Sequence, residues 1–112
     1  MNNDESAFRQ VVAATLKKIA SDVDAIEADG FDSRLSDGVF QVDFEAGGTF
    51  VLSQQVPTRE LWLSANAHAW HFRHDEGGRW PERDRGDALV DVLEGLFTKK
   101  LGRPVRLAGL RG

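Results

Sequence analysis

The stretch Phe50-Val-Leu-Ser-Gln-Gln-Val-Pro57-Thr-Arg-Glu-Leu-Trp62-Leu-Ser64 decides the fold, because it predicts two strands joined by a short connection. Pro57 lacks a backbone N–H and therefore belongs in the connection, not in a central strand. In the second strand Leu61 and Leu63 fall on one face and Trp62 on the other. Trp62 then lies either on a contact surface, where Trp is a strong anchor, or on a second buried face.

Further alternating segments extend this pair into a predicted antiparallel sheet. From Val39 to Glu45 apolar and polar side chains alternate, which is typical of a strand with one buried face. Turns rich in Gly and Asp separate the segments. The strands that we expect are 31–35, 39–45, 49–53, 61–64, 70–73 and a short sixth strand that begins at 79–80.

Apolar residues at steps of three and four predict two amphipathic helices that flank the strands. The first covers roughly residues 5–28, and the second begins after Gly86 and runs to Leu101. The order helix, strands, helix predicts an α+β fold. We expect a two-layer α–β sandwich, with two helices packed on one face of an antiparallel sheet of five to six strands.

Two helices can cover only one face of such a sheet, so the other face is expected to meet solvent. Trp62, Gln41 and Asp43 have the alternation that places them on this open face. A chain of 112 residues fits one domain, which we assign to residues 1–112. We expect its last residues, about 108–112, to form a loose tail.

The net charge of −4 is unevenly distributed along the chain. Residues 1–45 hold 10 acidic and 4 basic residues, which disfavours nucleic acid as a partner because phosphates require Lys and Arg clusters. No apolar run approaches the length of a membrane-spanning helix, so no membrane partner is expected. The chain has no cysteine, which excludes disulfides and thiolate metal sites. The acidic N-terminus is unlike a signal peptide, and we expect a cytoplasmic protein.

Five carboxylates cluster around the end of the first predicted helix, where the helix dipole prefers cations. Their oxygens suit Fe³⁺ and tolerate Fe²⁺, Mn²⁺ or Ca²⁺, but they lack the loop spacing of a dedicated cage, so weak and unselective binding is expected. The same carboxylates could dock an Arg-rich protein surface or form a solvated face. This cluster, named here the acidic ridge, consists of Asp22, Asp24, Glu27, Asp29 and Asp32.

No catalytic motif is visible, neither a nucleophile with its base nor a phosphate-binding glycine loop, so we expect no enzymatic activity. His68, His71 and His74 lie three residues apart. On a helix they would share a face, but a loop and a strand scatter them. We therefore do not expect a histidine metal site.

Three groups of residues form a recognisable set of motifs. They are Gln55-x-Pro57 with Trp62-Leu63-Ser64, the Gly38-Val39 … Phe44-Glu45 … Gly48 hairpin, and Trp70-His71-Phe72 … Gly78-Arg79-Trp80. In their order and spacing these motifs resemble the frataxin family and in particular its bacterial, CyaY-type branch, and the resemblance covers roughly residues 6–107. The family's usual Asn-Arg before Gln-x-Pro is replaced here by Ser53-Gln54.

The resemblance implies an iron-binding protein of iron–sulfur cluster assembly that acts as iron donor, sensor or regulator. Its partners would be the cysteine desulfurase (IscS-type) and the iron–sulfur scaffold protein. Iron, Fe²⁺ or Fe³⁺, would bind weakly on the acidic ridge. The partner-binding residues on the sheet would be Trp62, Gln55, Gln54, Gln41 and Asp43.

Two other functions remain open at this point. One is a ferroxidase or iron-storage assembly, although the chain lacks a Glu-x-x-His di-iron motif. The other is a protein-interaction module with incidental metal binding. We expect a monomer, with iron-driven oligomers as the alternative.

Overall fold

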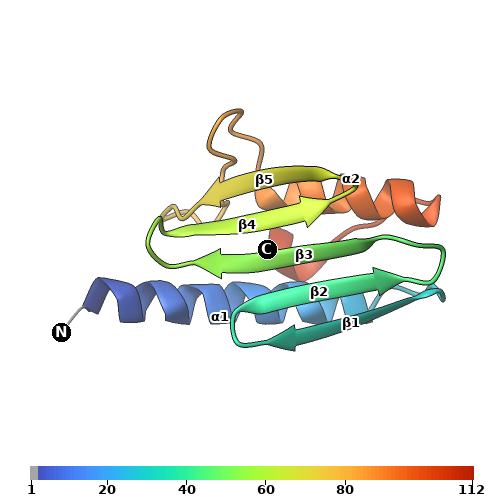
Figure 1. Cartoon of the computed structure of the whole chain (residues 1–112), viewed down its shortest axis with the longest axis horizontal. Helices are drawn as coiled ribbons and strands as arrows, with labels where there is room; N and C mark the ends of the chain where they lie inside the picture. The colour runs from blue at the N-terminus through green and yellow to red at the C-terminus, as the bar shows by residue number, and fades with distance from the viewer. Residues whose placement is uncertain (1–2) are drawn as a thin grey trace.

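A computed structural model describes residues 3–112 and contains one antiparallel sheet with its helices on one side (Figure 1). Helix α1 (Asn3–Asp24) comes first, and α2 (Leu89–Leu101) and α3 (Ala108–Arg111) come last. The strands lie in the sheet in chain order, each antiparallel to the next. They are β1 (Phe31–Ser36), β2 (Val39–Phe44), β3 (Thr49–Gln55), β4 (Glu60–Ala65) and β5 (His68–Arg73).

The core lies between this sheet and the helix layer, which confirms the predicted two-layer α–β sandwich. Alternate residues of β2, β3 and β4 are buried, as period-two patterning requires. Phe97 of α2 contacts the rings of Phe44 and Phe50 with centroid distances of 6.1 and 5.4 Å. The apolar residues that α1 buries are Phe8, Val12, Leu16, Ile19 and Val23.

Helix α1 ends at Asp24, so the prediction that it extends to about residue 28 is wrong. The last turn contains no basic side chain to complement the negative end of the helix dipole, and acidic residues crowd it. Ile26 still packs against the core, but from an irregular connection that begins with a turn. The apolar spacing that predicted a longer helix is therefore satisfied by a different backbone.

The predicted sixth strand at Arg79-Trp80 is also absent from the described residues. Trp80 is 1% exposed and has a φ of 54°, a left-handed conformation that cannot continue a strand. The Asp75 carboxylate holds this turn by accepting hydrogen bonds from the backbone N–H groups of residues 79 and 80, at 2.9 and 3.0 Å. Only an isolated bridge, Phe72 to Glu82, follows beside β5.

The C-terminus forms a short helix instead of the predicted loose tail. The carboxylate of Asp22 on α1 accepts hydrogen bonds from the N–H groups of Gly109 and Leu110, at 2.9 and 2.8 Å. Arg111 pairs with Asp91 and Glu94 on α2, at 2.6 and 2.7 Å. Helix α3 is thus attached to both long helices. None of the helices in the described part of the chain has the length and apolar character needed to cross a membrane.

Candidate functional site

The acidic ridge follows the chain from the last turn of α1 through the irregular connection into β1. Asp24, Glu27, Asp29 and Asp32 are exposed. None of the ion pairs formed within residues 3–112 involves a carboxylate of the ridge. These four carboxylates therefore face solvent without a direct ion pair to a basic side chain.

Asp22 differs from the other ridge residues because it is partly buried and has a structural partner. Both of its carboxylate oxygens accept backbone N–H groups at the start of α3. A carboxylate so engaged is a poorer metal ligand than an exposed one, since a cation would compete with two hydrogen bonds. No local pattern predicts this contact, because the partners Gly109 and Leu110 lie at the other end of the chain.

Two basic residues of the segment after α2 lie beside the ridge. The guanidinium of Arg103 donates a hydrogen bond to the backbone carbonyl of Glu27. Arg103 and Arg106 line a shallow cavity of about 340 Å³ together with Asp22 and Glu27. The C-terminal segment thus places positive charge along one side of the ridge, which lowers the local attraction for cations.

The carboxylates of the ridge do not form a preformed metal cage. Nowhere in residues 3–112 do three or more His, Asp or Glu side chains converge closely enough to hold a metal ion. His74 contacts the rings of Phe8 and Trp80, whereas His71 lies on the open sheet face. The ridge can attract cations electrostatically, with water completing their coordination.

Trp62 lies on the open sheet face, half-buried among its neighbours. In the register of the sheet it stands between Ser53 on β3 and His71 on β5. Its indole stacks on the His71 imidazole with centroids 4.4 Å apart and an interplanar angle of 24°. Trp62 is thus not part of the core, and its side chain does not project freely into solvent. It forms a stacked aromatic pair with His71 on the open sheet face.

Glu60 fixes the other end of this indole. The Trp62 Nε1–H donates a 2.8 Å hydrogen bond to Glu60 Oε1, and Glu60 is only 3% exposed. Arg83, from the loop after β5, lies 3.8 Å from the second carboxylate oxygen. Sequence reasoning missed Glu60, although its position two residues before Trp62 places both side chains on one face of β4.

Gln41 and Asp43 lie on the same open face, on β2. The Asp43 carboxylate accepts hydrogen bonds from Gln41 and Thr49, each 3.0 Å long. These bonds, with the nearby Arg34 guanidinium, hold the pKa of Asp43 below its ordinary value. Asp43 stands directly opposite Asp32 of the ridge in the β1–β2 register, so ridge and open face are contiguous there.

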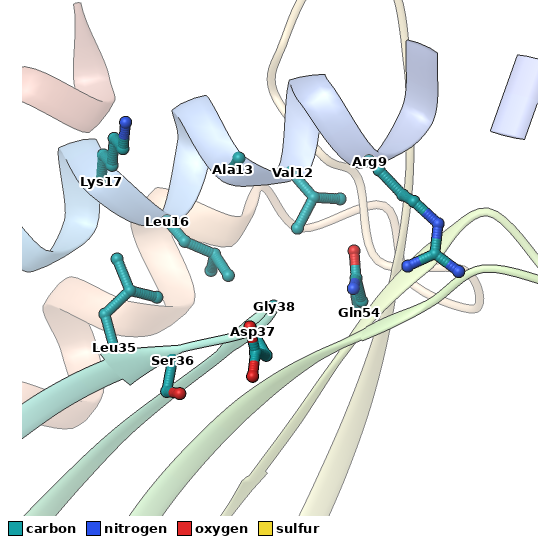
Figure 2. Close-up of a pocket in the computed structure, with 10 residues that line it drawn as sticks. All are labelled: Arg9, Val12, Ala13, Leu16, Lys17, Leu35, Ser36, Asp37, Gly38 and Gln54. Carbon is teal, nitrogen blue, oxygen red and sulfur yellow. The ribbon is translucent and has the colours of Figure 1, made fainter. Parts of the chain in front are cut away.

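Gln55 lies on the open face, where it donates a hydrogen bond to Ser53 at 3.3 Å. Gln54 does not, and the expectation that it belongs to the same surface is wrong. Figure 2 shows the Gln54 side chain on the helix side of the sheet, directed toward Arg9 of α1. It lines a cavity of about 560 Å³ together with Val12 and Leu35. The signal was present in the sequence, because Gln54 shares the alternation of Phe50 and Leu52.

Comparison with known proteins identifies relatives over almost the whole chain. Residues 1–103 match the family described as a frataxin-like domain. The chain is 32% identical to the iron-sulfur cluster assembly protein CyaY of Azotobacter vinelandii, over 98% of this chain and 100% of the relative. It is 34% identical to the iron-sulfur cluster assembly protein CyaY of Cupriavidus necator, over 92% of this chain and 95% of that one.

Two solved structures have a similar fold. A frataxin from Psychromonas ingrahamii superposes with a TM-score of 0.84 at 22% identity, covering 96% of this chain and 98% of that one. The trimeric frataxin of the yeast Saccharomyces cerevisiae, complexed with ferrous iron, superposes with a TM-score of 0.58 at 23% identity, covering 92% and 89%. At these identities the likeness concerns the fold alone.

Proposed function

The chain belongs to the frataxin-like family, as its sequence motifs indicated, and on that premise we propose that it binds iron and serves in iron–sulfur cluster assembly. The names of its relatives in Azotobacter vinelandii and Cupriavidus necator support the assembly role. The yeast frataxin complexed with ferrous iron supports the iron association. The protein acts without an enzymatic activity of its own, as iron donor, iron sensor or regulator.

The observation that carries this proposal is the exposed part of the acidic ridge. Asp24, Glu27, Asp29 and Asp32 are exposed, and their carboxylates form no ion pair with the rest of residues 3–112. Such a surface attracts ferrous or ferric ions weakly and docks a basic patch of a cysteine desulfurase. Asp22 accepts two hydrogen bonds from α3, so it contributes to the negative electrostatic potential of the ridge more than to direct coordination of an iron ion.

The open sheet face supplies the second contact. The Trp62 indole is held in position by its hydrogen bond to Glu60 and by stacking on His71, so it presents a preorganised aromatic group on this face. Gln55 lies on the neighbouring strand β3, and Gln41 and Asp43 lie on the same open face two strands away, on β2. We assign this face to the scaffold side of the desulfurase–scaffold complex.

Anaerobic titration with Fe²⁺, followed residue by residue by NMR, tests iron binding. Paramagnetic broadening confined to residues 24–32 is the expected result. Broadening spread evenly over the surface, or none, would leave a protein-interaction module with incidental metal binding. That second candidate is favoured by one observation, the lack of a preformed metal group within residues 3–112.

A charge-reversed variant tests desulfurase docking. Changing Asp24, Glu27 and Asp29 together to Lys is expected to weaken binding to the desulfurase at least tenfold, because attraction becomes repulsion. Asp22 is left unchanged because its replacement would release α3. The matched control changes the exposed Glu76, Asp84 and Asp87 to Lys, which alters net charge equally near β5. Equal loss in both variants would assign the effect to net charge and remove the ridge as the docking surface.

A further inference from the structure

The two edges of the sheet differ. Beside β5, the N–H of Arg73 donates to the carbonyl of Pro81 and the carbonyl of His71 accepts the N–H of Arg83, at 2.9 and 2.8 Å. Residues 81–83 therefore cover that part of the β5 edge. Strand β1 forms the opposite edge, as Figure 1 shows, and among the described residues no segment pairs with its outer side. An unpaired edge is a template for another strand.

The register defines which backbone groups face outward from β1. The N–H of Glu45 donates to the carbonyl of Gly30, so this opposing pair is hydrogen-bonded. Hydrogen-bonded and non-hydrogen-bonded pairs alternate along an antiparallel ladder. The N–H and C=O groups of Phe31, Ser33 and Leu35 consequently point away from β2, toward solvent.

The side chains of β1 are complementary to those of a second, antiparallel copy of the same strand. Residues 31–35 run apolar, acidic, Ser, basic, apolar: Phe-Asp-Ser-Arg-Leu. We infer that β1 pairs in antiparallel fashion with β1 of a second copy of this chain, centred on Ser33. The outward groups of Phe31 then meet those of the second copy's Leu35, and Ser33 meets its counterpart, giving about six backbone hydrogen bonds.

Side-chain charges select this register. Centred on Ser33, Asp32 stands opposite Arg34 of the second copy, twice over, in the close non-hydrogen-bonded positions where side chains approach best. Centring the pair on Asp32 or on Arg34 places like charges opposite one another, which is unfavourable. Arg34 is well placed for this contact because its side chain is 68% exposed while it lies 3.4 Å from Asp43 of its own chain.

Apolar burial favours the same pairing. Leu35 is the one large apolar side chain in residues 3–112 that is exposed, at 37%, and it lies on the helix side of β1. In the paired sheet it covers Phe31 of the second copy, which is itself incompletely buried. One strand on each side makes a small interface, so the dimer is weak and forms at high micromolar to millimolar concentration.

The dimer does not rest on the proposed function, but it affects the same surface. Pairing engages Asp32, a member of the acidic ridge. It is centred on Ser33, whose hydroxyl lies 3.4 Å from the carboxylate of Asp24, a second member of the ridge. A protein that docks on the ridge would therefore compete with the second copy. In the dimer the acidic ridge is therefore partly covered and less accessible to a docking protein.

Sedimentation velocity from micromolar to millimolar concentration tests the inference, with three variants. The wild-type chain should shift from monomer to dimer. Ser33→Pro removes an outward N–H without breaking the β1–β2 ladder, so this variant should remain monomeric at every concentration. Arg34→Asp should weaken the dimer about tenfold or more, and the charge-swapped double variant, Asp32→Arg with Arg34→Asp, should restore it.

A wild-type chain that stays monomeric at millimolar concentration would overturn the inference, and so would a dimer that Ser33→Pro leaves intact. If circular dichroism shows that Ser33→Pro is unfolded, the comparison of Arg34→Asp with the double variant tests the β1–β1 pairing instead. Equal weakening in both would exclude the Asp32–Arg34 pairing. In the wild-type chain, NMR amide shifts that grow with concentration should be confined to β1 and its neighbours.

Discussion

The indole N–H of Trp62 is bonded to Oε1 of Glu60 at 2.8 Å, which ties the largest side chain of the open face to a carboxylate that is almost wholly buried. Stacking on His71 fixes the opposite side of the ring. The orientation of Trp62 is therefore set before any partner arrives, and each residue of this group can be tested separately.

Replacing Glu60 by Ala should release the Trp62 indole. The loss of the acceptor, and of the charge facing Arg83, should lower the free energy of unfolding by about 1–3 kcal/mol. Glu60→Gln keeps an acceptor oxygen and should cost less. The indole N–H resonance of Trp62 in a ¹⁵N-edited NMR spectrum should move toward its solvent-exposed position in the Ala variant only. An unmoved resonance would mean that the hydrogen bond does not persist in solution.

Trp62→Arg should leave the fold intact and weaken binding to the desulfurase–scaffold complex at least tenfold, because an aromatic anchor is lost from the open face. Binding by calorimetry and thermal unfolding should be measured on the same sample. Trp62→Phe, which preserves stacking on His71, is the matched control and should bind with intermediate affinity. A large loss of thermal stability in the Arg variant would identify Trp62 as a core residue.

Asp22 and Asp24 should respond differently to the same substitution. Asp22→Ala removes the acceptor of two backbone N–H groups of α3 and should lower the free energy of unfolding by about 1–2 kcal/mol. Asp24 lies two residues further along the same ridge, at the end of α1. Asp24→Ala should change the free energy of unfolding by less than about 0.5 kcal/mol. Urea unfolding measures both. Equal effects would mean that α3 contributes nothing to stability.

Acid should weaken the attachment of α3 through Glu94. Burial raises the pKa of Glu94, but hydrogen bonds from Arg111 and from the Leu107 N–H outweigh it, so the pKa lies below the ordinary value of 4.5. The folded state thus binds fewer protons than the unfolded state. The stabilising effect of the ionised Glu94 carboxylate is complete above pH 4.5 and is lost as the pH falls through the pKa that Glu94 has in the folded state.

The test is the free energy of unfolding by urea at several values between about pH 5 and pH 3, in the wild-type chain and in Glu94→Gln. The wild-type chain should lose more stability over this range than the variant, and the difference isolates Glu94 from Asp43 and Glu82, whose pKa values are also lowered. Parallel profiles would contradict the assignment.

Gly38 should tolerate a methyl group less well than Gly47. Both have a positive φ, 77° and 107°, which any other residue adopts with strain. A Cβ on Gly38 would also lie 2.3 Å from Nε2 of Gln54, whereas one on Gly47 would meet no atom within 4 Å. Gly38→Ala should therefore destabilise more than Gly47→Ala in urea unfolding, and adding Gln54→Ala should recover part of the difference. Additive effects would show that Gln54 does not pack on the turn.

Alternation and helical spacing were enough to predict the sandwich and the face of Trp62, because both depend on periods that the sequence shows directly. The end of α1 was not predictable in this way, since Ile26 can reach the core from a helical backbone as well as from the irregular connection that the structure contains. The role of Asp22 depends on Gly109, 87 residues away, which no local pattern contains. Gln54 is a different case, because its alternation with Leu52 places it on the helix side whatever its family counterpart does.

The cover that residues 81–83 provide over β5 sets a limit on how copies can add together. A sheet with two free edges could pair with further copies on both sides and form a fibre. Because residues 81–83 cover part of the β5 edge, we expect pairing to stop once β1 of one copy has paired with β1 of a second. The Asp75 carboxylate, which anchors the turn before this cover, therefore bears on solubility as well as on stability. A substitution that disrupts this turn would expose the β5 edge as a second site for strand pairing, so that dimers could associate further into fibres.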